Sequence, residues 1–288
     1  MSVRLTHPAA EYVANARSSV AVGLAFLLAW SPEALWARTL HFAFATVSRV
    51  SRKRPAWRER QVRRWLSVLP ALRTYRPGGW RIRTELRGRE HLDAALAHGN
   101  GAILWVSRDV HGSNLAGMIG LARAGYRVQQ LTRPGHGFGG SAFQRRWLNP
   151  VVLRAEARWL GGHLMLPEGA ELGAFRGVRA RLAAKEVVSI IALRGPARRH
   201  IVVEVDGEAW RFPSGPVTLA RRSGAPLLPV FVSASRRGRV TVGIESPLPS
   251  ATESNPVAAF EAFARLLQAH RPADSSWVRS GTARRDRG

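Results

Sequence analysis

From residue 80 onward, short apolar runs alternate with segments of helical spacing, and this alternation most constrains the fold. Strands that are joined through helices need crossover connections, so the sequence predicts an α/β protein with a mixed, largely parallel sheet flanked by helices. Segment lengths and periodicity predict strands over 80–86, 102–106, 126–131, 187–193, 227–232 and 240–244, and helices over 91–98, 115–124, 176–185 and 260–270.

Length and cysteine content narrow the classes of protein. A chain of 288 residues with 45% hydrophobic residues can bury one sizeable core, so we expect a single α/β domain over residues 76–274. An N-terminal segment over 1–75 precedes it, and a basic, disordered tail over 275–288 follows it. The sequence holds no cysteine, which excludes disulfides, thiolate metal ligands and a cysteine nucleophile. We expect no metal and no bound cofactor.

The charge of the chain predicts an anionic partner. Its 44 Lys and Arg residues against 19 Asp and Glu residues give a formal net charge of +25. Such an excess favours an acidic lipid surface, an acidic carrier protein or a phosphate-bearing substrate. Nucleic acid also fits the charge, but the sequence carries no nucleic-acid recognition motif, so this partner is not expected. A genome-wide bias toward Arg is the alternative explanation for part of the excess.

The N-terminal segment has the composition of a membrane-associating region. Residues 20–30 form an uncharged apolar run that ends at Ser31 and Pro32. The run is shorter than the ~20 residues that span a bilayer, so we expect a helix that lies in the membrane interface. The basic segment over 49–65 follows, with Trp57 and Trp65 among its cations, and predicts docking on anionic lipid. An ordinary buried helix followed by a solvated basic helix is the alternative.

Residues 212–231 carry the most specific pattern in the chain. They read Phe-Pro-Ser-Gly-Pro-Val-Thr-Leu-Ala-Arg-Arg-Ser-Gly-Ala-Pro-Leu-Leu-Pro-Val-Phe, which predicts a Ser-Gly turn, a short helix, a Gly turn and a buried strand. These residues, called the signature segment below, resemble the family of lipid A biosynthesis (lauroyl/myristoyl) acyltransferases and lysophospholipid acyltransferases. The resemblance extends over about residues 80–250.

The resemblance implies a fold, a reaction and a location. It implies a glycerolipid acyltransferase-like domain with an N-terminal helical membrane anchor. The implied reaction moves a fatty acyl group from an acyl carrier protein or coenzyme A thioester to a hydroxyl or amine of a lipid or other amphiphile. The implied partners are anionic membrane lipid and the acidic carrier protein or coenzyme A thioester. The implied place is the cytoplasmic face of a bacterial inner membrane.

The loop over 107–114 is where this family carries a His, four further residues and an acid. In this chain Asp109 stands in the place of the His, and Asn114 stands in the place of the acid. Asp with a pKa near ~3.9 is a poor base for an alcohol, and Asn cannot neutralise an imidazolium. His111 is a candidate for a displaced base. The chain therefore resembles a divergent member of the family, and a catalytically inactive scaffold that binds acyl lipid or a partner enzyme is the alternative. A capped helix start is a structural explanation of Asp109 and Asn114.

The glycine-rich segment over 132–141 is a second candidate for chemistry. His136 and Arg133, with the backbone N–H groups of the loop, could hold a phosphate or act on the acceptor. The glycines of 135–140 also match the dinucleotide fingerprint. We disfavour that reading because no clear first βαβ unit precedes it and because Glu156 falls in a helical stretch. A plain surface loop is the alternative.

Further residues are candidates for binding the substrate's anionic groups. Arg108 lies in the loop over 107–114, and Arg194 follows the strand over 187–193. Ser214 and Gly215 open the helix of the signature segment, whose N–H groups could meet an anion. A literal His-x4-Glu pattern occurs at His163 and Glu168. It lies on an expected strand, where residues five apart tend to face opposite sides, so we expect no paired dyad there.

Overall fold

The computed structural model describes most of the expected α/β domain, namely residues 72–75, 80–108, 114–132, 136, 142, 144–166, 171–191, 199–234, 239–249, 255 and 257–270. The predicted N-terminal membrane anchor, apart from 72–75, and the predicted tail lie outside the described residues. None of the helices in the described ranges has the length and apolar character needed to cross a bilayer.

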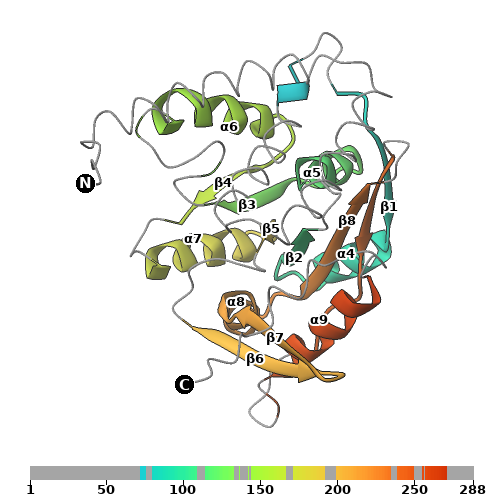
Figure 1. Ribbon diagram of the computed structural model, residues 1–288. Coiled ribbons are helices and arrows are strands. Elements are labelled where there is room, and N and C mark those ends of the chain that lie inside the picture. The colour runs from blue at the N-terminus through green and yellow to red at the C-terminus, as the bar shows by residue number, and fades with distance from the viewer. Residues whose placement is uncertain are drawn as a thin grey trace, which may run out of the picture.

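A seven-stranded sheet forms the centre of the fold, in the order β1-β9-β8-β2-β5-β3-β4. Strands β8, β2, β5, β3 and β4 are mutually parallel, whereas β9 is antiparallel to β8 and parallel to β1. The predicted mixed, largely parallel sheet is thus confirmed (Figure 1). The strands are β1 Arg83–Arg87, β2 Ala102–Arg108, β3 Val128–Thr132, β4 Gly162–Met165, β5 Val187–Ile190, β8 Leu227–Ala234 and β9 Arg239–Ile244.

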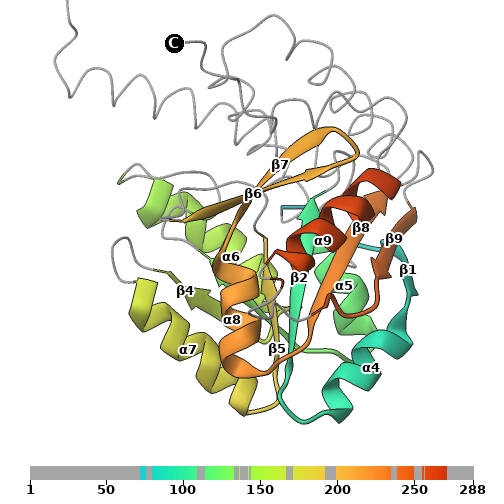
Figure 2. The same ribbon diagram turned by 90° about the horizontal axis from the view of Figure 1, so that it is seen from below.

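Helices cover both faces of the sheet, as Figures 1 and 2 show from two sides. The helices that pack on one face are α4 Arg89–Ala97, α5 Asn114–Arg123 and α6 Asn149–Ala157. Those on the other face are α7 Glu171–Ala183, α8 Gly215–Ser223 and α9 Ala258–Ala269. A short π-helix, η1 Gln144–Leu148, leads directly into α6. The predicted helices are all present, with ends shifted by a few residues.

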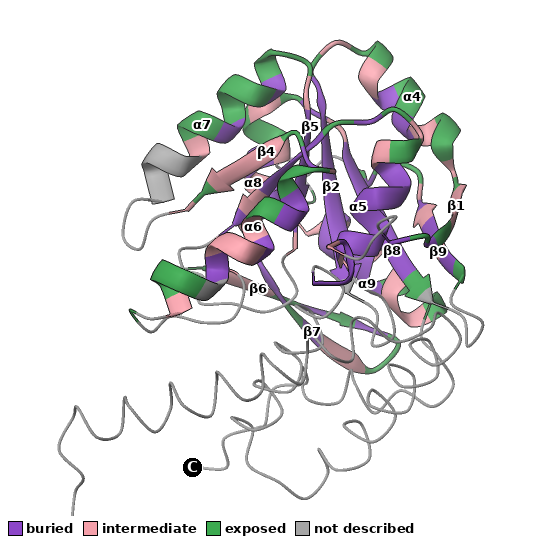
Figure 3. Ribbon diagram, turned by 90° about the horizontal axis from the view of Figure 1, so that it is seen from above, coloured by how far each residue is buried: buried purple, intermediate pink, exposed green. Residues whose placement is uncertain are grey.

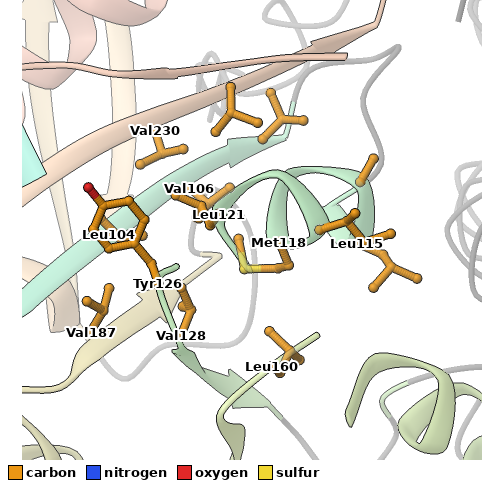
Figure 4. Close-up of a cluster of buried hydrophobic side chains, with 14 of the residues drawn as sticks. Leu104, Val106, Leu115, Met118, Leu121, Tyr126, Val128, Leu160, Val187 and Val230 are labelled. Atoms are coloured by element: carbon orange, nitrogen blue, oxygen red, sulfur yellow. The ribbon is translucent and has the colours of Figure 1, made fainter. Parts of the chain in front are cut away.

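Each face of the sheet has its own hydrophobic core, because the side chains of successive strand residues point to opposite faces. Figure 4 shows Leu104 and Val106 of β2 packed near Met118 of α5 on the first face. On the second face the fully buried Trp105 stacks on Phe263 of α9 at 4.0 Å between ring centroids. The central strands β2 and β5 are accordingly buried on both sides (Figure 3).

Helix α5 carries glycine where it crosses the strands, and this lets its backbone lie close to the sheet. A Cβ atom at Gly117 would lie 2.7 Å from Cγ2 of Val232 in β8. A second glycine, Gly120, faces Val242 of β9 and Thr84 of β1. The two glycines therefore let the helix backbone approach β8, β9 and β1, and they fix where its first residue, Asn114, meets the sheet.

The signature segment folds as its sequence predicts. Ser214 precedes α8, and the helix ends at Gly224, whose φ of 69° is the left-handed conformation that glycine adopts readily. The chain then enters β8 at Leu227, and the backbone of that strand is buried at the centre of the sheet. Because every step is set by neighbouring residues, the sequence was sufficient for this prediction.

A two-stranded hairpin, β6 His200–Val205 and β7 Glu208–Pro213, was not expected from the sequence. It packs on α9 and buries Trp210 and Phe212. The two residues of its turn, Asp206 and Gly207, have φ values of 50° and 73°. An Asp-Gly pair between alternating apolar residues is a strong signal for this type of turn, so the sequence did contain the information.

Candidate functional site

Polar side chains interrupt the hydrophobic core under α5 and α6, where β5, β3 and β4 lie side by side. Gln130 of β3 is the register neighbour of Ser189 in β5 and of His163 in β4. Neighbours in register point to the same face, and this is the face that α5 and α6 cover. Gln130 and Ser189 are buried. A row of three polar side chains in a core of aliphatic ones is costly, so it indicates a functional role.

Asn114 joins this row from the start of α5. Its Nδ2 donates a hydrogen bond to Oε1 of Gln130 at 3.3 Å. Within the described part of the chain, Oδ1 of Asn114, Oγ of Ser189 and both ring nitrogens of His163 are buried without a hydrogen-bond partner. Buried polar atoms that the protein itself leaves unpaired are available to a bound molecule.

His136 and Glu156 form a hydrogen-bonded pair beside the row. His136 follows the end of β3 and Glu156 lies on α6, and Nε2 of the imidazole is 2.8 Å from Oε2 of the carboxylate. The carboxylate side chain is 8% exposed, whereas the imidazole is 27% exposed. A carboxylate accepts from Nε2–H, so it places the proton of the neutral imidazole on Nε2 and leaves the Nδ1 lone pair as the base.

His163 approaches the same carboxylate from β4. Its Nε2 is 3.5 Å from Oε2 of Glu156, and its ring centroid is 5.9 Å from that of His136. We regard the contact with Glu156 as electrostatic, because the geometry is not that of a hydrogen bond. Burial lowers the pKa of His163 below the usual value of 6.5, the charge of Glu156 raises it in part, and His136 lowers it further. The net effect of these surroundings favours the neutral state of His163.

The structure brings together two of the predicted site residues, His136 and Asn114, through Gln130 and His163. The predicted residues Asp109, His111, Arg133 and Arg194 lie outside the described residues, as does Glu168. Arg108 is the last residue of β2, where its backbone pairs with Val232.

Ser214 and Gly215 lie with α8 on the opposite face of the sheet from His136. The backbone N–H of Ser214 donates to the carbonyl of Arg199 at 3.1 Å, and its hydroxyl also points to that carbonyl at 3.4 Å. Ser214 therefore ties α8 to the start of the hairpin. No group of His, Asp and Glu side chains in the described ranges has a geometry that could hold a metal ion.

Sequence reasoning missed Glu156 as the partner of His136. The two residues are 20 positions apart and are joined by η1 and most of α6, so no local pattern marks them as a pair. The sequence had placed Glu156 in a helix, which is confirmed, but gave it no role. His163 was weighed only against Glu168, whereas the structure shows that its carboxylate neighbour is Glu156.

Comparison with known proteins finds similarity for part of the chain, although no family model matches it. Over 155 residues the chain is similar in sequence to lipid acyltransferases. The relatives are the phosphatidylinositol mannoside acyltransferases of two Mycobacterium tuberculosis strains, ATCC 25618 / H37Rv and CDC 1551 / Oshkosh, each 34% identical to it. The match covers 52% of this chain and 44% of each relative, so the chain spans less than half the length of these proteins.

A solved structure was also found. The 1-acyl-sn-glycerophosphate acyltransferase PlsC of Thermotoga maritima superposes with a TM-score of 0.40 and 13% sequence identity, and the superposition covers 88% of this chain and 99% of that one.

Proposed function

We propose that this protein is a membrane-associated acyltransferase that moves a fatty acyl group from a thioester to a hydroxyl or amine of a lipid or other amphiphile. The observation that carries the proposal is the 2.8 Å contact between His136 and the buried carboxylate of Glu156. Such a pair supplies the base and the orienting acid that the loop over 107–114 lacks. The sequence match to lipid acyltransferases supports the same reaction.

In the proposed mechanism His136 is the catalytic base. Its Nδ1 takes the proton of the acceptor hydroxyl while the oxygen attacks the thioester carbonyl. A C–O bond forms, the C–S bond breaks, and the proton passes from the imidazolium to the departing thiolate sulfur. Glu156 holds the ring orientation and balances the charge of the imidazolium. Asn114 and Gln130 offer polar atoms near the acceptor.

The proposal extends to the substrates and the place of action. The donor is an acyl carrier protein or coenzyme A thioester, and the acceptor is held at the cytoplasmic face of a bacterial inner membrane. The names of the relatives make a phosphatidylinositol mannoside the first acceptor to test. A lipid A precursor is the second, because the signature segment resembles lipid A acyltransferases.

The test is acyl transfer by the purified chain and its variants. Radiolabelled acyl carrier protein and coenzyme A thioesters are supplied with each acceptor, and product formation is measured. We expect His136→Gln to lower kcat/KM by about 10²–10⁴, because it removes the base, and Glu156→Gln to lower it at least about tenfold, because it removes the charge that orients and stabilises the imidazolium. Asp109→Ala and His111→Ala are made in parallel to test the loop that the family uses.

A matched control exists elsewhere in the chain. His270 and Glu245 form another histidine–carboxylate pair at 2.9 Å, far more exposed than the pair at the site. His270→Gln and Glu245→Gln should leave transfer unchanged. Transfer that survives His136→Gln but is lost in His111→Ala would move the base to the loop. Acyl-lipid binding without transfer by the wild-type chain would establish the inactive scaffold instead.

A further inference from the structure

The π-helix η1 presents a large apolar side chain to solvent. Trp147 is 61% exposed, the highest value among the exposed large hydrophobic residues of the described chain. The guanidinium of Arg146 lies 5.6 Å from the centre of its ring, and Arg145 beside it is also exposed. π-Helices are rare and often occur at functional positions. An exposed Trp next to arginines is the pairing that suits the boundary between lipid headgroups and acyl chains.

The position of η1 couples this surface to the candidate site. The chain runs from His136 to η1 and α6, and Glu156 near the end of α6 contacts His136 again through a hydrogen bond. Trp147 lies between them in sequence, on the only π-helix of the described chain. Trp147 is therefore linked along the chain to both members of the pair, through η1 and α6.

Almost all charged residues in this part of the chain are positive. Residues 127–167 contain six arginines, namely Arg127, Arg133, Arg145, Arg146, Arg154 and Arg158, and a single acidic residue, Glu156. Because Glu156 is buried against the two histidines, its charge faces the site and not the solvent. Five of these arginines, Arg127, Arg145, Arg146, Arg154 and Arg158, are described and exposed. The described surface of this region thus carries cations with an apolar ring among them, and it complements an anionic lipid surface rather than a neutral one.

We infer that η1 is a membrane-docking element in which Trp147 enters the headgroup region of an anionic bilayer while Arg146 contacts lipid phosphates. The inference rests on the proposed function, since it explains how a membrane lipid reaches His136. It differs from the anchor expected over residues 1–75, because it assigns a second contact to the α/β domain itself. Docking here holds the site next to the bilayer surface, from which an acceptor can enter.

The absence of cysteine from the chain permits a test at a single residue. Trp147→Cys is labelled with an environment-sensitive fluorophore and mixed with vesicles of phosphatidylcholine and phosphatidylglycerol. We expect the emission to shift to the blue and to rise at least about twofold as the label leaves water. Val202→Cys is the matched control, because Val202 is also apolar and is 59% exposed, but on the hairpin strand β6. A label at 202 should stay in water.

The contribution of charge is tested in the unlabelled chain. Arg146→Gln should weaken binding to the same vesicles about fivefold, whereas Arg179→Gln, at an exposed position of α7, should not. The inference is overturned if the emission of the labels at 147 and 202 changes equally. It is also overturned if the label at 147 responds equally to vesicles of pure phosphatidylcholine. A label at 147 that stays in water while the chain binds vesicles or does not bind them at all overturns it too.

The two proposals can fail separately. If the label at 147 stays in water but the wild-type chain transfers acyl groups to acceptors dissolved in detergent, only the docking inference is wrong. If the label enters the bilayer but no donor and acceptor pair gives a product, the membrane contact stands and the proposed reaction is wrong.

Discussion

At the scale of single residues, one carboxylate serves two imidazole rings in different surroundings. Glu156 forms a hydrogen bond with the partly exposed His136 and only an electrostatic contact with the more buried His163. Burial favours the neutral form of His163, so a positive charge on this ring would be costly in the proposed reaction. In the proposed mechanism His136 therefore takes the proton, whereas His163 only contacts the same carboxylate.

The lowered pKa of His163 predicts how stability depends on pH. Between this pKa and 6.5 the unfolded chain binds more protons than the folded one. The free energy of unfolding should therefore fall as the pH drops from 6.5 toward the pKa of the folded state. Above 6.5 the ring is neutral in both states, and His163 does not reduce the free energy of unfolding. His163→Gln cannot titrate, so its stability should decline less steeply over this interval. Urea unfolding at a series of pH values measures both slopes, and equal slopes would show that His163 gains no protons on unfolding.

Residue by residue, the sequence singled out His136 but not the carboxylate that contacts it. His136 stood out because it lies in a glycine-rich loop after a strand, which is local information. Glu156 did not, because its role depends on how α6 returns to β3 and β4 after η1. Contacts between residues on different elements follow from packing and not from spacing, so a dyad built this way has no motif.

At the scale of elements, the closeness of α5 to the sheet determines where Asn114 meets Gln130. The helix depends on Gly117, because a Cβ there would lie 2.7 Å from a methyl group of the β-branched, buried Val232. Neither the helix nor the sheet can move apart freely, since α5 is buried along most of its length. The spacing between α5 and β8 is thus part of the site, although no catalytic group lies there.

We expect Gly117→Ala to destabilise the fold by about 1–3 kcal/mol through overpacking, which exceeds the gain in helix propensity. Gly177→Ala on α7 is the control, because a Cβ at that exposed helical position has nothing within 4 Å. It should stabilise by up to about 1 kcal/mol. Urea denaturation of the two variants and the wild type measures the difference. Equal shifts of the two variants would mean that α5 can withdraw from β8 at no cost.

Elements differed in how well the sequence predicted them. The segment from Ser214 through Gly224 into β8 was anticipated, since caps and turns are set by adjacent residues. The hairpin β6–β7 carried an equally local signal at Asp206 and Gly207, and the charged residues before it led us to treat the region up to His200 as a loop. The π-helix η1 had no sequence signal of its own, because its geometry is a property of how the chain bridges His136 and α6.

At the scale of the whole molecule, net charge and site chemistry contribute separately to the rate of the proposed reaction. The formal net charge of +25 creates a long-range field that attracts any polyanion, whereas the proposed chemistry of His136 and Glu156 acts only on an acceptor already in place. Under the proposed function, binding to an anionic bilayer would concentrate the acceptor without changing the chemical step. These contributions respond differently to ionic strength, because salt screens exposed charges far more than a buried pair.

Ionic strength should accordingly separate the two contributions in the intact chain. On acceptor lipid in phosphatidylglycerol vesicles, raising salt from about 0.05 M to about 0.5 M should lower the rate about tenfold or more, since the Debye length falls below the separation between protein cations and lipid. On a short-chain acceptor dissolved as monomers, the rate should change less than about twofold, because the chemistry at His136 involves a partly buried pair. Initial rates for both acceptors across the same salt series are the measurement. An equal loss on both would place the salt effect within the site, whereas no loss on either would show that the cationic surface does not recruit the substrate.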